Sequence, residues 1–319
     1  MRSVTGIHHI TAMAGDPQAN VDFYTRTLGL RLVKRTVNFD DPHTYHLYFG
    51  DESGRPGTIL TFFPWGADSL HGRIGGGQVS VTGFAIPRGA MDYWIERLSA
   101  HDVSFDGPAR RFDESAIVLE DPDGVVLELV ETADARPGWS NREVPAEFAI
   151  RGFHQATLLV GSADATVRLI TDTMGFRPVA ETGNRLRFAA GDGSPGTMLD
   201  LVIEPERRHG SMGVGVVHHI AFRATTDADQ LALRDELVAV GRDVTPVIDR
   251  EYFHSIYFRE PGGVLFEIAT DAPGFAIDEA LAELGTHLKL PPWFEASRAE
   301  IERRLAPVSV PASNNPGLR

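Results

Sequence analysis

The chain has 319 residues, and 30 Lys and Arg against 44 Asp and Glu give a formal net charge of −14 with His neutral, which argues against a nucleic-acid-binding protein. Apolar residues make up 42% of the chain and aromatic residues 9%, enough to bury the cores of about two domains, so extensive disorder is excluded. The absence of Cys excludes disulfides, thiolate nucleophiles, iron–sulfur clusters and Cys-bound zinc, so a metal would have to bind His, Asp, Glu or Tyr.

The first ten residues, MRSVTGIHHI, do not resemble a targeting segment. They lack the basic region and the long apolar region of a signal peptide, and no stretch of the chain reaches 18 uninterrupted apolar residues. We therefore expect a soluble, cytoplasmic protein.

A repeat of roughly 60 to 80 residues organises the sequence into four units. In each unit a short strand is followed by a helix and three further strands, and the units cover residues 6–64, 77–131, 152–205 and 214–270. Units two and four end in the related sequences DPDGVVLELVE and EPGGVLFEIAT, in which a tight turn leads into an apolar strand. The repeat predicts an α+β fold of four β-α-β-β-β modules, paired into two incomplete barrels with concave interiors.

The modules divide the chain into four expected segments: an N-terminal pair of modules at 1–131, a linker at 132–150, a C-terminal pair at 151–275 and a helical tail at 276–319. The linker is polar, contains Pro and shows no periodicity. Two stretches of the tail, residues 278–290 and 297–306, carry helical patterning.

Two His pairs occupy the first strands of modules one and four. They are His8-His9 and His218-His219, and because adjacent side chains on a strand face opposite ways, only one His of each pair can point into a given cup. Glu267 lies in an otherwise apolar last strand, where an unpaired carboxylate would cost several kcal/mol. Two His and one carboxylate form the ligand set of mononuclear non-haem iron(II) sites, which leave positions open for substrate and dioxygen.

The ligand set depends on which modules share a cup, if first-strand and last-strand positions contribute symmetrically. Pairing module one with four gives His9, Thr61, His219 and Glu267. Pairing three with four gives Gln155, Asp200, His219 and Glu267, and pairing one with two gives His9, Thr61 and Glu128. Among these sets, the pairing of one with four supplies two His and one carboxylate without a further acid.

Several longer motifs carry a family resemblance. They are IHHIT at 7–11, YHLYFGDESGRPGT at 45–58, FAIPRGAMDYW from 84, RGFHQAT from 151, VVHHIAF from 216 and REYFHSIYFREPGGVLFE at 250–267. Over nearly the whole chain they resemble the vicinal oxygen chelate superfamily, and within it the hydroquinone ring-cleaving dioxygenases, iron(II) enzymes similar to the extradiol dioxygenases.

The resemblance implies that the second His of each pair is a ligand, so that His9, His219 and Glu267 hold iron(II), with manganese(II) or zinc(II) as substitutes. It also implies that modules one and four build this site and that modules two and three build a cup without metal, where Gln155 stands in place of His9. Glu128, at the position equivalent to Glu267, is then expected in an ion pair or at the surface rather than on a metal.

The resemblance further implies four catalytic residues beside the metal: Thr11, His218, Arg250 and Tyr257. Arg250 is a permanent cation that can hold an anionic oxygen, Tyr257 offers a phenolic proton, and His218 is a proton acceptor. His46, His154 and His254 are weaker candidates for the cups or the substrate pocket.

The implied reaction is the opening of a small hydroquinone-type, para-dihydroxylated aromatic ring by O2, which places both oxygen atoms in an acid product. The expected partners are this substrate and O2, with no nucleic acid and no membrane. A homo-oligomer is a further possibility, because edge strands of each cup could pair between subunits. Two alternatives use the same fold: a glyoxalase-type metal-dependent isomerase or thiol transferase, disfavoured by Thr61 at the position of a second carboxylate, and a metal-free protein that binds an aromatic drug or quinone.

Overall fold

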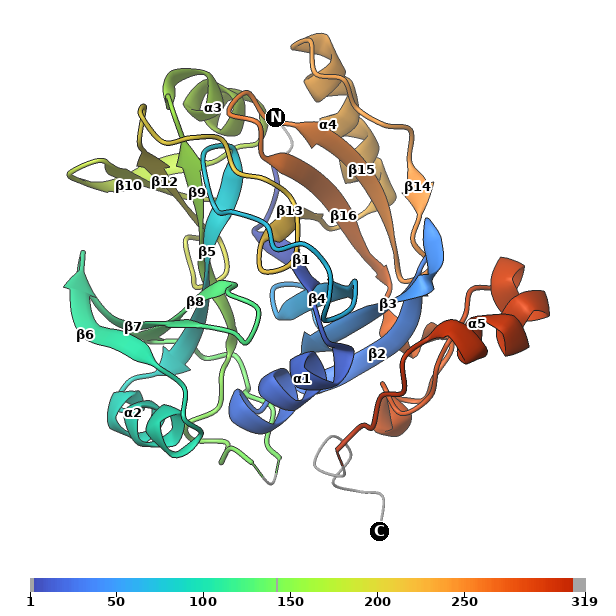
Figure 1. Ribbon diagram of the computed structural model, residues 1–319. Helices are drawn as coiled ribbons and strands as arrows, with labels where there is room; N and C mark the ends of the chain where they lie inside the picture. The colour runs from blue at the N-terminus through green and yellow to red at the C-terminus, as the bar shows by residue number, and fades with distance from the viewer. Residues whose placement is uncertain (1–2, 142, 312–319) are drawn as a thin grey trace.

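The protein forms two curved sheets of eight strands each, which lie side by side in the computed structural model (Figure 1). The structure describes residues 3–141 and 143–311. The first sheet has the strand order β14-β15-β16-β13-β1-β4-β3-β2. Its strands are β1 (Ile7–Ala14), β2 (Arg31–Asn38), β3 (Asp41–Gly50), β4 (Ile59–Pro64), β13 (Val217–Ala224), β14 (Ile248–Asp249), β15 (Phe253–Arg259) and β16 (Leu265–Pro273).

The second sheet has the order β10-β11-β12-β9-β5-β8-β7-β6. Its strands are β5 (Gln78–Pro87), β6 (Phe105–Arg111), β7 (Glu114–Glu120), β8 (Val126–Thr132), β9 (Gly152–Val160), β10 (Arg177–Thr182), β11 (Arg185–Ala189) and β12 (Met198–Ile203). The predicted fold of four modules in two incomplete barrels is confirmed. We call the concave interior of the first sheet the first cup and that of the second sheet the second cup.

Each sheet combines one module from each half of the chain. Modules one and four meet where β1 pairs with β13, and modules two and three meet where β5 pairs with β9, in both cases antiparallel. The expected pairs of modules at 1–131 and 151–275 are therefore consecutive in the chain, but each pair contributes one module to each sheet. The boundaries of these segments stay a prediction.

A helix follows the first strand of every module. These helices are α1 (Pro17–Asp22) continued by η1 (Phe23–Thr27), α2 (Met91–Ala100), α3 (Asp164–Arg168) continued by η2 (Leu169–Thr173), and α4 (Asp227–Ala239). Side-chain caps begin two of them, since Asp16 accepts from the Ala19 N–H and Thr226 from the Asp229 N–H. No helix of the described residues is long and apolar enough to cross a membrane.

The C-terminal segment lies beside β2 and β3 of the first sheet (Figure 1) and contains η3 (Phe275–Ile277), η4 (Leu281–Glu283), η5 (Pro292–Ser297) and α5 (Arg298–Arg304). The helix predicted at 278–290 is wrong, because this stretch forms only one short turn. Gly285 has φ +78°, which ends any helix there, and Glu279 is drawn into an ion pair with the buried Lys34 at 2.9 Å. Residues 312–319 of the predicted tail lie outside the described residues.

Candidate metal centre

The strand register brings three side chains to one point of the first cup. Ala221 of β13 is paired with His9 of β1 on one side and with Glu267 of β16 on the other. His219 precedes Ala221 by two positions, so it points to the same face of the sheet. His9, His219 and Glu267 therefore meet in the first cup although 258 positions separate the first from the last.

These three residues are the one group of His and acidic side chains among residues 3–141 and 143–311 whose ligand atoms lie close enough to hold a metal ion. The Glu267 Oε2 atom lies 2.9 Å from His219 Nε2 and 3.3 Å from His9 Nε2, and the two ring nitrogens are 3.3 Å apart. All three side chains are almost completely buried. The Glu267 Oε2 atom is buried without a hydrogen bond, which fits a metal ligand better than a structural carboxylate.

The first His of each pair orients the second. His8 Nδ1 lies 2.9 Å from His9 Nδ1, and His8 Nε2 lies 3.1 Å from the Thr270 carbonyl oxygen. Burial and the neighbouring His9 lower the pKa of His8 to about 3, so His8 is neutral. It therefore donates from Nε2 to the carbonyl and accepts the His9 Nδ1 proton, which leaves the His9 Nε2 lone pair for a metal.

The second pair repeats this arrangement. His218 Nδ1 lies 2.7 Å from His219 Nδ1, and burial and His219 lower the pKa of His218 to about 3. Glu267 is oriented by Ser255, whose hydroxyl donates to Oε1 at 2.5 Å. Although burial alone would raise it, the two His rings hold the pKa of Glu267 well below its usual range. The donor set of two imidazoles and a carboxylate fits a divalent first-row metal.

A cavity of about 440 Å³ opens onto these ligands. Three of the four predicted catalytic residues line it: His218, Arg250 and Tyr257. Thr11 is buried behind them and accepts a hydrogen bond from the Thr61 hydroxyl at 2.9 Å. The structure thus places the four candidates around the first cup, and their catalytic roles stay a prediction.

Tyr257 lies opposite Glu267 in the pairing of β15 with β16. Burial and the Glu267 charge raise the pKa of Tyr257 above its usual value, so the phenol keeps its proton. Arg250 Nε donates to the phenolic oxygen at 3.2 Å, and Arg250 Nη1 lies 3.2 Å from Asp40 Oδ2. Because the Tyr257 oxygen accepts from Arg250, its own O–H can donate to a molecule bound in the cavity.

The weaker His candidates fall in three different places. His46 lines the cavity, with Nδ1 2.7 Å from the Tyr48 hydroxyl and Nε2 2.8 Å from the Thr61 hydroxyl. Burial and the ligand His rings lower its pKa well below the usual value. His154 is buried in the second cup, 2.7 Å from Glu114, and His254 does not line the cavity but pairs with Asp227 at 2.7 Å.

Sequence reasoning missed Asp40, Ser255 and the chain of hydrogen bonds from Tyr48 through His46 and Thr61 to Thr11. These contacts join strands β1, β3 and β4 and loops whose mutual position the repeat does not specify. The one available signal was the alternation of polar residues in YHLYF, where His46 and Tyr48 share a face.

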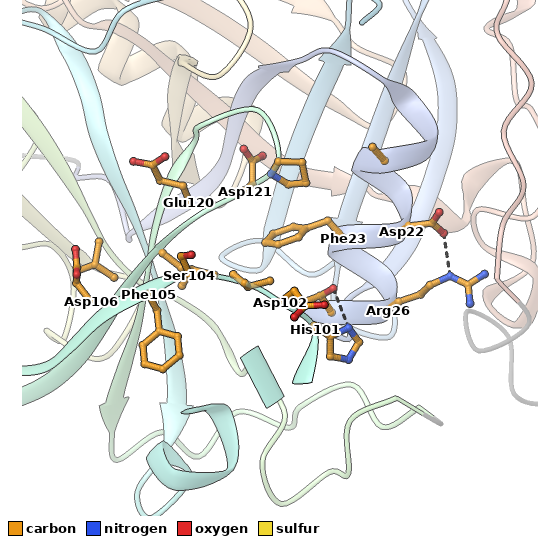
Figure 2. Close-up of a pocket in the computed structure, with 16 residues that line it drawn as sticks. Asp22, Phe23, Arg26, His101, Asp102, Ser104, Phe105, Asp106, Glu120 and Asp121 are labelled. Carbon is orange, nitrogen blue, oxygen red and sulfur yellow. Dashed lines mark hydrogen bonds and ion pairs between the residues drawn. The ribbon is translucent and has the colours of Figure 1, made fainter. Parts of the chain in front are cut away.

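A larger cavity of about 740 Å³ lies away from the metal ligands, between the α1–η1 helix and strands β6 and β7 (Figure 2). Its wall carries Phe23, Asp102, Asp106 and Glu120, and Arg26 pairs with Asp22 at its edge at 2.9 Å. None of the residues that line it belongs to the His9, His219 and Glu267 group.

The model of the Glyoxalase/Bleomycin resistance protein/Dioxygenase superfamily matches residues 6–129 and 152–268, which are the four modules. The chain belongs to this superfamily. Within the superfamily it is 49% identical over 310 residues to a Bacillus subtilis (strain 168) protein provisionally named the ring-cleaving dioxygenase MhqO, with 97% of this chain and 98% of that protein covered.

The chain is also similar over most of its length to a named hydroquinone dioxygenase and to a solved structure. The chlorohydroquinone/hydroquinone 1,2-dioxygenase of Sphingobium indicum is 37% identical over 309 residues, with 95% of this chain and 96% of that protein covered. A crystal structure from Bacillus subtilis subsp. subtilis str. 168, provisionally named a dioxygenase, superposes with a TM-score of 0.94 at 48% identity and covers 98% of this chain and 99% of that one. The predicted family resemblance is confirmed.

Proposed function

We propose that this superfamily member is an iron(II)-dependent, extradiol-type dioxygenase that uses O2 to open a small para-dihydroxylated aromatic ring. The observation that carries the proposal is the meeting of His9, His219 and Glu267 at a cavity whose wall also holds a proton donor and a cation. The names of the ring-cleaving relatives support the reaction class, and that of the hydroquinone dioxygenase supports the substrate class.

Three protein ligands leave coordination positions open, so iron(II) bound there would supply a Lewis acid for a substrate oxygen and an electron-transfer route to dioxygen. Manganese(II) or zinc(II) would fit the same donors. The remaining chemistry, which is proton transfer, orientation and exclusion of water, is left to the side chains of the cavity.

Tyr257 is assigned the role of proton donor to a substrate oxygen during ring opening. Its phenol is buried and keeps its proton, and because the oxygen accepts the bond from Arg250, the O–H remains a donor for a molecule in the cavity. Arg250 lines the same wall and stabilises negative charge that develops on the substrate.

His218 is assigned a hydrogen-bond donor, which differs from the proton acceptor expected from its residue type in the sequence. When His219 holds a metal through Nε2, its proton is on Nδ1 and is donated to His218 Nδ1, 2.7 Å away. A neutral His218 then carries its own proton on Nε2. Thr11 is placed by its bond from Thr61 and keeps a hydroxyl proton for the same cup.

The test is anaerobic reconstitution with iron(II), followed by an oxygen-electrode trace after addition of methylhydroquinone, with catechol and with methylglyoxal plus glutathione run in parallel. We expect uptake of one O2 per hydroquinone consumed above the autoxidation blank, and none from the Glu267→Gln variant. Stoichiometric iron without oxygen uptake from any phenol would contradict the proposal. Turnover of the glutathione adduct would indicate the isomerase alternative, and failure to bind any metal would indicate a metal-free binding protein.

A further inference from the structure

We propose that Asp40 determines substrate specificity by neutralising Arg250, so that the cavity accepts uncharged para-dihydroxylated rings and rejects those that carry a carboxylate. The inference rests on the proposed function for its turnover assay. Its binding assay does not depend on turnover.

Among the described residues that line the cavity, Asp40 and Arg250 are the two side chains with a permanent charge. They form an ion pair with a distance of 3.2 Å between Arg250 Nη1 and Asp40 Oδ2. Apart from the proposed metal ligands, the described wall of the cavity therefore carries no permanent positive charge that lacks an acidic partner.

The ion pair joins the two edges of the first sheet. Asp40 lies in the turn between β2 and β3, and Arg250 follows β14, while β2 and β14 are the outermost strands of this sheet. The Asp40 N–H donates to Asn38 Oδ1 at 3.0 Å, and the Arg250 N–H donates to the Phe253 carbonyl oxygen at 2.9 Å. Both charged residues are thus anchored through their backbones, which holds the pair across the open side of the cup.

The rest of the wall favours apolar substituents. Seven apolar side chains line the cavity, among them Phe63, Ile248, Phe253 and Leu265. A carboxylate on the ring would lose its hydration against this surface. Arg250 would not compensate for the loss while Asp40 holds it, and the Asp40 charge would repel a second anion. Removal of the Asp40 charge should free Arg250 to bind that carboxylate.

The chain offers a matched control one residue away. Asp41 is also an exposed acid, but its carboxylate accepts from the Thr44 hydroxyl at 2.8 Å and does not line the cavity. Asp41→Asn therefore changes the net charge by the same amount as Asp40→Asn without touching Arg250. Asp40→Glu keeps the charge and should keep the preference.

The experiment compares methylhydroquinone with 2,5-dihydroxybenzoate, a para-dihydroxylated ring with one carboxylate. For Asp40→Asn we expect the ratio of kcat/KM for the benzoate to that for methylhydroquinone to rise about 10-fold, or about 1.4 kcal/mol. The Asp41→Asn and Asp40→Glu ratios should stay near that of the wild type. A purely structural role of Asp40 would lower both rates together and leave the ratio unchanged, which overturns the proposal.

Anaerobic binding of both ligands, followed by tryptophan fluorescence, separates this proposal from the proposed function. We expect the Kd of 2,5-dihydroxybenzoate to be about 10-fold lower for Asp40→Asn than for the wild type. This expectation holds even if no variant consumes oxygen. Lack of turnover would then count against the dioxygenase assignment alone. An unchanged Kd in Asp40→Asn, or a wild type that binds both ligands equally well, would overturn the specificity rule.

Discussion

The two cups are built on the same strand register but hold their central carboxylates in opposite ways. In the first cup Ala221 is paired with His9 and Glu267, and in the second cup Gly83 is paired with Gln155 and Glu128. Gln155 therefore stands where the first cup has His9. Its amide donates to Glu128 Oε2 at 2.6 Å, whereas Glu267 Oε2 in the first cup faces the ring nitrogens of His9 and His219.

The nearest Arg completes the contrast. Arg111 and Arg250 occupy equivalent positions, each directly before a residue with positive φ, Phe112 at +52° and Glu251 at +64°. Arg111 donates from both Nη atoms to Glu128, at 2.8 and 2.5 Å, which confirms the ion pair expected of Glu128. In the first cup Arg250 donates to the Tyr257 hydroxyl oxygen instead of to the central carboxylate.

The residue opposite the carboxylate differs between the cups and provides Arg250 with one of its two partners, the other being Asp40. Tyr257 pairs with Glu267, whereas Val118 pairs with Glu128. Val118 offers no hydroxyl to hold Arg111 away from the acid. In this chain the carboxylate opposite Tyr257 is the one whose neighbouring Arg side chain has its partners elsewhere.

The last-strand position of modules one and three, Thr61 in the first cup and Asp200 in the second, also differs between the cups. Asp200 of the second cup pairs with Thr157 as Thr61 pairs with Thr11. Asp200 is bound by Arg187 at 2.7 Å and by Arg185 at 2.9 Å, so this acid is neutralised as well. The two carboxylates of the second cup at these positions, Glu128 and Asp200, are thus both paired with Arg side chains.

The largest predicted effect comes from replacing the central carboxylate of each cup by an amide. Glu267→Gln should weaken metal binding by more than about 100-fold and abolish oxygen uptake, because it removes a ligand charge. The matched Glu128→Gln variant should keep its metal and activity. Metal content by atomic absorption after dialysis, with oxygen uptake, provides the measurement. Full metal content in Glu267→Gln, or its loss in Glu128→Gln, would show that the cups have been assigned the wrong way round.

The equivalent Arg residues should separate stability from activity. Arg111→Met leaves Glu128 buried without its cation and should lower the free energy of unfolding by about 3 kcal/mol. Arg250→Met should cost less than about 1 kcal/mol, because the Asp40 side chain is 76% exposed, but should lower kcat/KM. Chemical unfolding and steady-state rates on the same samples provide the test. Equal losses of stability in the two variants would remove this distinction between the cups.

Tyr257→Phe tests the aromatic residue opposite Glu267. It keeps the ring but removes the proton donor, so turnover should fall by roughly 10²-fold, or about 2.7 kcal/mol, with metal content unchanged. Tyr252→Phe is a control, since Tyr252 bonds Asp278 outside the cavity. A Tyr257→Phe variant with the wild-type rate would take this residue out of the mechanism.

The smallest effect concerns the seam between the two sheets. Burial raises the pKa of Asp121 to about 6, and this side chain accepts from the Tyr24 hydroxyl of module one at 2.9 Å. Because the folded pKa lies above the unfolded value of 3.8, stability from this group is present below pH 3.8 and is lost as pH rises through 6. Between pH 4.5 and pH 7 the loss is about 2 kcal/mol.

The measurement is the free energy of unfolding of the wild type minus that of Asp121→Asn across this pH range. We expect the difference to shift by about 2 kcal/mol in favour of the variant at pH 7. Asn keeps an acceptor oxygen for the backbone N–H of Val125, which Asp121 holds at 2.8 Å. A difference that is flat with pH would show that Asp121 titrates normally.

The repeat and the His pairs predicted the parts of the molecule that depend on strand order. Once modules one and four share a sheet, the register between β1, β13 and β16 follows, and with it the meeting of His9, His219 and Glu267. The alignment of units two and four also matched Glu128 to Glu267. These features depend on the alternation of side chains along strands and on the spacing of the repeats, both of which can be read from the sequence without knowledge of side-chain packing.

The remaining features depend on contacts between elements that no local pattern links. Asp40 acts through Arg250, 210 positions away, because the sheet curls until its edges face each other. The predicted helix at 278–290 failed for a related reason. Its first residues bind the buried Lys34, so tertiary contacts override the local helical pattern.

The interleaved connectivity sets the order in which the protein can become active during synthesis. His9 lies on β1 in the first module, but Glu267 lies on β16, the last strand of the fourth module. A ribosome-bound fragment that contains modules one to three has one edge of the first sheet without its partner and a single metal-binding His in place. The three-ligand centre is therefore completed only when the fourth module has been translated, and a chain that lacks this module cannot bind a metal through all three residues.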